Sequence, residues 1–138
     1  MAIRVKFVLY CSAAALLLTI VAVVFLYREK ILNYVTVYQD EKRFLASKDE
    51  YESHSGAFSF RSGKKIQLYP WEEDGFAGQN FFTILIYDET RQILLNSDRW
   101  DPEFVSYIKS HDRTLIHPDC SHSVYNLRDD YFVVRIAC

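Results

Sequence analysis

The chain has 138 residues, enough for one ordinary globular domain, and carries 16 basic and 18 acidic residues for a formal net charge of −2. Half of the residues are hydrophobic and a quarter are charged, which excludes a disordered or collagen-like chain. Residues 1–30 hold four of the basic residues and one acidic residue. The remaining 108 positions therefore hold 12 basic and 17 acidic residues, a balance that disfavours nucleic-acid binding.

The segment 7–27 contains no charged residue, proline or glycine over 21 positions. As a helix it would be about 31 Å long, close to the ~30 Å hydrocarbon core of a bilayer. It is longer than the ~7–15 apolar residues of a cleaved signal peptide, which is the alternative. We therefore predict a short tail over 1–6, a transmembrane signal-anchor helix over 7–27 that contacts the lipid bilayer, and a juxtamembrane linker over 28–32.

Small side chains lie along one face of this predicted helix, at Cys11, Ala15, Thr19 and Ala22. Such a stripe would let a second helix approach closely, so a homo-oligomer formed through the transmembrane helix is one interpretation of it. The alternative is that small residues are simply common in membrane helices.

The rest of the chain contains two cysteines, Cys120 and Cys138. An even pair in a small exported domain predicts a disulfide, which would stabilise the fold by about 3 kcal/mol. No asparagine begins an N-x-S/T site, which is a frequent feature of luminal eukaryotic domains. The charges that flank the helix do not decide its orientation, but the short N-terminal tail is typical of a signal anchor. We predict a single-pass protein of the bacterial inner membrane with a periplasmic C-terminal domain.

The first elements of this domain are predicted from periodicity and turn residues. Asn33–Tyr38 is rich in β-branched and aromatic residues and predicts a strand. Residues 40–52 are charged with apolar positions near helical spacing, which predicts a short amphipathic helix, with a hairpin as the alternative. Apolar residues alternate with other residues in segments 57–61 and 64–69, which flank a Ser-Gly turn. This pattern predicts a β-hairpin that ends at Pro70.

The middle of the domain alternates between polar and apolar stretches. Residues 71–79 contain two glycines and three acidic residues and predict a loop. Residues 80–88 form the most apolar stretch outside the predicted membrane helix and predict a central strand. A turn over 89–91 leads to a further predicted strand over 92–96.

The last third of the chain carries the clearest helix signal. Asp101 is a favourable N-cap for a helix, Pro102 suits the first helical position, and Glu103 suits the first turn. Apolar residues then recur at helical spacing. Residues 123–127 and 131–137 predict a final hairpin. Residues 33–138 therefore predict one extracytoplasmic α+β domain with a mainly antiparallel sheet and one or two helices.

Residues 117–122 form the densest polar cluster. It contains His117, Asp119, Cys120 and His122, which are zinc-ligand types, but their spacing matches no zinc pattern. A Cys–His nucleophile is a second interpretation of this cluster. The argument against it is that a cysteine in an exported protein is usually oxidised when a second cysteine is available. No catalytic motif is present. We predict no metal site, no cofactor, no catalytic residue and no enzymatic activity.

Aromatic residues suggest a binding surface. Eighteen of the 108 positions from 31 to 138 are Phe, Tyr or Trp, more than a small core readily hides. The predicted loop combines aromatic and acidic side chains, which would suit a basic protein partner. The predicted binding residues are Trp71, Glu72, Glu73, Asp74, Phe76 and Trp100. The alternative is that Trp71 and Phe76 only cover the edge of the sheet.

Together these features predict a membrane-anchored periplasmic protein-binding module. In organisation alone, the chain is similar to bacterial immunity proteins that protect a cell from toxins in the periplasm, and no motif transfers residue roles. That similarity implies an inhibitor that neutralises a toxin or another envelope protein. One alternative is a structural subunit of an envelope membrane assembly. The other is a metal- or thiol-dependent enzyme that uses residues 117–122.

Overall fold

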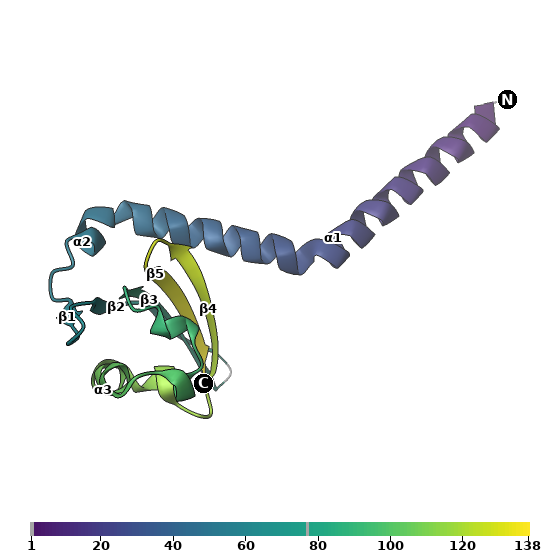
Figure 1. Cartoon of the computed structure of the whole chain (residues 1–138). Coiled ribbons are helices and arrows are strands. Elements are labelled where there is room, and N and C mark those ends of the chain that lie inside the picture. Colours follow the sequence, from purple (N-terminus) through teal and green to yellow (C-terminus); the bar gives the residue numbers. More distant parts are fainter. Residues whose placement is uncertain (1, 77) are drawn as a thin grey trace. The chain divides into compact units, whose positions relative to one another are not determined.

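The computed structural model describes residues 2–76 and 78–138, and the side chains of residues 2–12 and of Phe76 lie outside the described part. The chain divides into two compact units, Met1–Arg43 and Phe44–Cys138. The second unit is an α+β domain built on a five-stranded antiparallel sheet (Figure 1). The predicted α+β class of this domain, with a mainly antiparallel sheet, is therefore confirmed.

Most of the first unit is one helix, α1 (Ala2–Ala46). It runs through Asn33–Tyr38, so the strand predicted there is wrong. Each β-branched residue disfavours a helix by less than about 1 kcal/mol. No glycine or proline interrupts the sequence from Ala2 to Ala46. A helix that has already formed therefore continues through this stretch, because each added residue gains one more backbone hydrogen bond.

Residues 7–27 are helical, as the sequence predicts. The prediction that they span a membrane is not supported by the structure. Within the described part of the chain, no helix has an apolar stretch long enough to cross a membrane. The side chains of residues 7–12, which begin the predicted span and include Cys11 of the small-residue stripe, lie outside that part. The transmembrane helix therefore stays a prediction.

The sheet has the strand order β1-β2-β3-β5-β4, and all neighbouring strands are antiparallel. The strands are β1 (Phe58–Ser59), β2 (Lys65–Phe76), β3 (Gln79–Asp88), β4 (Ser121–Arg128) and β5 (Tyr131–Ala137). The apolar strand β3 lies at the centre, and both predicted hairpins form. In the first hairpin, Gly63 adopts a φ of 80°, which glycine accepts without strain.

The sheet buries both of its faces, because successive side chains of a strand point to opposite sides. On one face, Ile84 and Ile86 pack with Phe104 of helix α3 (Pro102–His111). On the other face, Leu85 and Tyr87 pack with a second cluster. The second cluster contains Phe44, Tyr51, Trp71, Tyr131 and Val133.

Strand β2 does not end at Pro70. Where the sequence predicted a loop over residues 71–79, residues 71–76 continue β2 and Gln79 begins β3. Pro70 pairs with Ile84 and Glu72 pairs with Thr83, so the register shifts by one residue at Trp71. Strand β1 pairs with β2 only as far as Ile66, so Pro70 lies on an open edge of the sheet. An edge position and a bulge are the places where a strand tolerates proline.

The predicted helix start at Asp101 is confirmed. The Asp101 carboxylate accepts a hydrogen bond of 2.8 Å from the Phe104 amide, and Pro102 begins helix α3. The helix predicted over residues 40–52 is also present, but in two parts. Residues 40–46 form the end of α1, and α2 (Lys48–Glu52) follows after Ser47.

The strand predicted over 92–96 is wrong. The chain forms two short 3-10 helices here, η1 (Gln92–Leu94) and η2 (Ser97–Arg99). A third, η3 (Arg113–Ile116), follows α3. The cause lies in Asp88, whose buried carboxylate accepts hydrogen bonds from the amides of Thr90 (2.8 Å) and Ile93 (3.0 Å). These bonds turn the chain immediately after the central strand.

The predicted disulfide is present between Cys120 and Cys138, which are 18 positions apart. It joins the residue before β4 to the residue after β5. The backbone of Cys138 also exchanges two hydrogen bonds with Asn80, of 2.9 and 3.2 Å. The C-terminal end of the chain is thus held on both sides.

Candidate functional site

The aromatic residue at the centre of the predicted binding surface, Trp71, is buried rather than displayed. Its side chain is 8% exposed and packs in the cluster with Tyr51. The indole Nε1 donates a hydrogen bond of 3.0 Å to the Tyr51 hydroxyl. Trp71 therefore packs on the sheet, which agrees with the alternative interpretation of this residue.

The three acidic residues of the predicted site are exposed on the β2–β3 hairpin. Glu72 and Asp74 point to one side of the strand and Glu73 to the other, because strand side chains alternate. The Asp74 carboxylate accepts a hydrogen bond of 2.8 Å from the Gly75 amide. The side chain of Phe76 lies outside the described residues.

Trp100 lies on the opposite face of the sheet from Trp71. It packs against the first core cluster, with its ring centroid 4.9 Å from that of Phe104. Its Nε1 donates a hydrogen bond of 3.1 Å to the Leu95 carbonyl. The structure therefore separates the two tryptophans that the sequence prediction placed in one surface.

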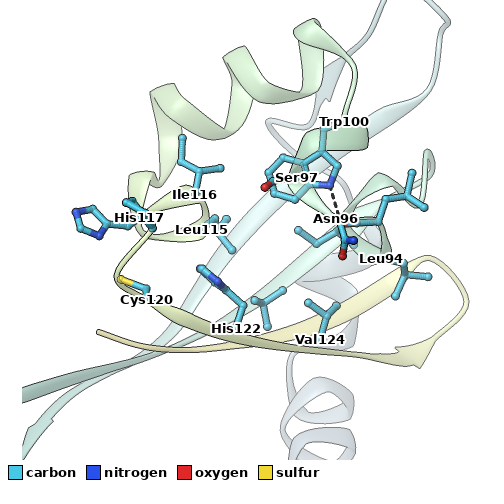
Figure 2. A pocket seen from close by; sticks show the side chains of 14 residues that line it. Leu94, Asn96, Ser97, Trp100, Leu115, Ile116, His117, Cys120, His122 and Val124 are labelled. Atoms are coloured by element: carbon cyan, nitrogen blue, oxygen red, sulfur yellow. Dashed lines mark hydrogen bonds between the residues drawn. The ribbon is translucent and has the colours of Figure 1, made fainter.

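Trp100 instead lines a surface pocket of about 580 Å³ (Figure 2). The walls come from η1, η2, η3 and the residues after them, and strand β4 contributes His122 and Val124. Figure 2 shows these two side chains rising from β4 towards the segment that holds Leu94, Asn96 and Ser97. The volume lies within the range of about 300–1,000 Å³ that is usual for ligand sites.

Most of the residues that line the pocket are apolar, polar groups contribute the larger share of its accessible surface, and two leucines are exposed in it. The side chains of Leu94 and Leu95 are 50% and 38% exposed. Sequence reasoning missed both residues, because it placed them in a strand. The signal that could have found them is Asp88, an acidic residue at the end of the most apolar strand, whose side chain suits a turn.

A hydrogen-bond pair fixes the wall that carries these leucines. The Gln92 side chain accepts a hydrogen bond of 2.7 Å from the Asp101 amide and donates one to the Asp101 carboxylate. These bonds tie η1 to the start of α3. The residues between them, including Leu94 and Leu95, are therefore held at both ends.

Two histidines lie at the other end of the pocket. The Nε2 of His122 is 2.8 Å from the Thr114 carbonyl oxygen. A carbonyl only accepts, so this nitrogen is the hydrogen-bond donor. His117 lies near Asp119, with its Nδ1 3.9 Å from the carboxylate.

The cluster at residues 117–122 does not present a metal site or a thiol nucleophile in this structure. Among the residues that the structure describes, no group of three or more His, Cys, Asp or Glu side chains is placed to hold a metal ion. Cys120 is bonded to Cys138, and nucleophilic chemistry requires a free thiolate. What the pocket offers is the exposed side chains of Leu94 and Leu95 among polar groups.

The aromatic cluster on the other face is packed and strongly desolvated. Burial, with Glu50 adding repulsion, raises the pKa of Tyr69 to about 12. Burial also raises the pKa of Tyr87 and of Tyr131. The His54 ring stacks on Tyr87 with centroids 3.9 Å apart. This arrangement is that of a packed core.

No family model, curated protein or solved structure matches this chain. The candidate site is therefore assigned from its own geometry.

Proposed function

We propose that the protein is a binding module for another protein, held at the bacterial inner membrane by its N-terminal helix, with its folded domain in the periplasm. The observation that carries the binding function is the exposed apolar surface of Leu94 and Leu95 beside Trp100 in the pocket. Apolar side chains rimmed by polar groups are characteristic of interaction sites, and tryptophan is a frequent anchor in them. An immunity-type inhibitor of a toxin is one form of this function.

The membrane attachment is supported by the exposed side chains of α1. Between Leu16 and Leu26, the large aliphatic and aromatic side chains are about half exposed or more. They occupy nine of the eleven positions, interrupted only by Thr19 and Ala22, and so surround the helix on all sides. A helix that is apolar all round is stable only when it is covered, and a bilayer covers it evenly. The periplasmic location is supported by the Cys120–Cys138 disulfide, since such bonds persist in oxidising compartments.

The attachment is tested by extracting membranes at alkaline pH and following the full chain. The double variant Leu17→Arg, Val21→Arg should be released from the membrane, because each charge in the hydrocarbon core costs about 3 kcal/mol. The double variant Leu17→Ala, Val21→Ala is the matched control and should stay in the pellet. Release of both variants and of the original chain would contradict the membrane anchor.

The binding site is tested by placing a photo-crosslinking residue at single positions of the full chain in cells. At Leu94 it should give one discrete adduct with another protein. At Lys109, an exposed position of α3 outside the pocket, it should give none. A discrete adduct at Asp74 and not at Leu94 would assign the binding to the acidic hairpin and a basic partner. No adduct at either position, combined with loss of function when the helix is exchanged, would favour a structural subunit.

A further inference from the structure

The two edges of the sheet differ in how well they are protected against pairing with another strand. An exposed edge offers a row of unpaired backbone groups, which proteins usually guard with charges, proline or a bulge. The β2 edge carries all three of these features. They are Pro70, the register shift between Pro70 and Glu72, and the acidic residues Glu72, Glu73 and Asp74.

Strand β4 forms the other edge and carries none of these features along most of its length. Among the described residues, no strand pairs with its outer side. From Ser121 to Leu127 it contains no proline and no Asp, Glu, Lys or Arg. Ser121, His122 and Ser123 are exposed, and the one register shift falls at the far end, between Asn126 and Arg128. This edge is therefore a template on which a further strand can form.

The pocket borders this unguarded edge. His122 and Val124 are alternate residues of β4, and both side chains line the pocket (Figure 2). In an antiparallel pair, residues directly opposite each other place their side chains on the same face. A strand added to β4 would therefore direct every second side chain towards the apolar surface of Leu94 and Leu95.

We propose that the partner binds by strand addition. An extended segment of another protein pairs antiparallel or parallel with the outer edge of β4 and inserts apolar side chains at positions i and i+2 into the pocket. This mode rests on the proposed binding function and specifies the partner as an uncharged, extended segment with alternating apolar residues. Main-chain hydrogen bonds supply affinity in such complexes, and the pocket supplies specificity.

The experiment uses the full chain in detergent micelles and a short blocked peptide in which leucine and threonine alternate. Binding is followed by amide hydrogen exchange and by the methyl signals of Leu94 and Val124. Two further peptides have the same side chains and are N-methylated at alternate amides, in opposite phases. N-methylation removes hydrogen-bond donors from one edge of the peptide only, so each modified peptide is the control for the other.

Strand addition predicts that the peptide protects alternate amides of β4 from exchange and shifts both methyl signals. One methylated peptide should bind like the parent. The other should bind at least about tenfold more weakly, because several backbone hydrogen bonds worth about 1 kcal/mol each are lost. The variant Leu94→Asp should lower the affinity for every peptide that binds, since it places a charge beside the apolar side chains that line the pocket.

Three results would overturn the proposal. If both methylated peptides bind like the parent and Leu94→Asp abolishes binding, the pocket takes side chains without strand pairing, and the proposed binding function stands. If no peptide changes any signal, the edge accepts no neutral strand, and the crosslinking at Leu94 decides the function separately. If the β4 amides are already protected in a concentration-dependent way, the edge is occupied by a second copy of this chain.

Discussion

Tyr69 illustrates how burial changes the chemistry of a single residue. Its hydroxyl donates a hydrogen bond of 3.2 Å to the Tyr51 carbonyl, and burial raises its pKa to about 12. A tyrosine in the unfolded chain has a pKa of about 10. Since the folded protein holds the proton more tightly, the folded state is favoured below pH 10, and that contribution is lost as the pH rises through the folded pKa.

We therefore expect the free energy of unfolding to fall with increasing pH above about 10. In Tyr69→Phe the group that titrates is removed, so the variant should lose less stability over the same pH interval, although its stability at neutral pH is lower by the lost hydrogen bond. Urea unfolding at a series of pH values from neutral to alkaline measures both effects. Tyr34→Phe, at an exposed position of α1, is the control and should retain the original pH dependence. If the free energy of unfolding of Tyr69→Phe depended on pH as steeply as that of the original chain, Tyr69 would not be the group responsible.

The two tryptophans show what a residue's identity does and does not predict. Both are large aromatic residues next to acidic ones, and the sequence placed both in a binding surface. Trp71 is part of the core, and Trp100 lines the pocket. Local sequence does not distinguish these cases, because the side of the sheet to which each ring points depends on strand register. At Trp71 the register shift itself decides the outcome.

At the scale of elements, the best-predicted feature was helix α3, because its signal is local. Asp101 caps the helix through a bond between neighbouring residues, and Phe104, Tyr107 and Ile108 are buried on one face. Such patterns depend on the chain within a few residues and need no tertiary contact. Hairpins with a turn between alternating strands are predictable for the same reason.

Asp101→Ala removes both the cap of α3 and the bond to Gln92 that holds the pocket wall. We expect a loss of about 1–2 kcal/mol in the free energy of unfolding, measured by denaturant titration. Asp98→Ala is the control, because Asp98 lies in the short helix η2 next to the pocket wall and caps no α-helix. It should change stability by less than about 0.5 kcal/mol. Equal effects of the two substitutions would show that the cap is not used.

The elements predicted wrongly were those whose conformation depends on their surroundings. Residues 33–38 are rich in residues that favour strands, and residues 92–96 contain an apolar run, yet 33–38 form part of α1 and 92–94 form the 3-10 helix η1. In the first case the preceding helix continues, and in the second the buried carboxylate of Asp88 redirects the chain. Propensities of a few tenths of a kcal/mol per residue do not outweigh either effect.

At the scale of the whole molecule, the disulfide joins the pocket to the end of the sheet. Cys120 lines the pocket, and Cys138 follows β5. The bond closes a loop that contains β4, which is the edge proposed to receive a partner strand. Its effect on stability is therefore coupled to the geometry of the site.

Replacing both cysteines, in Cys120→Ser, Cys138→Ser, should lower the free energy of unfolding by about 3 kcal/mol, because the unfolded chain regains its loop entropy. Amide exchange should also accelerate from residue 117 to residue 123, next to the lost link, and less in the centre of β3. Tris-carboxyethyl phosphine treatment of the original chain is an independent way to break the bond. Exchange that is accelerated equally over the whole sheet would show that the bond acts only on global stability.

The sequence alone predicted the features that arise from neighbouring residues: the helical conformation of residues 7–27, two hairpins, the capped helix α3, the apolar central strand and the pairing of two cysteines. Only the tertiary structure decided which side chains meet. The order β1-β2-β3-β5-β4 brings η1, η3 and β4 together into one pocket, although they are separated along the chain. It also places Trp71 and Trp100 on opposite faces. These outcomes depend on register and on burial of both faces, which are properties of the assembled sheet and are not encoded within any short window of sequence.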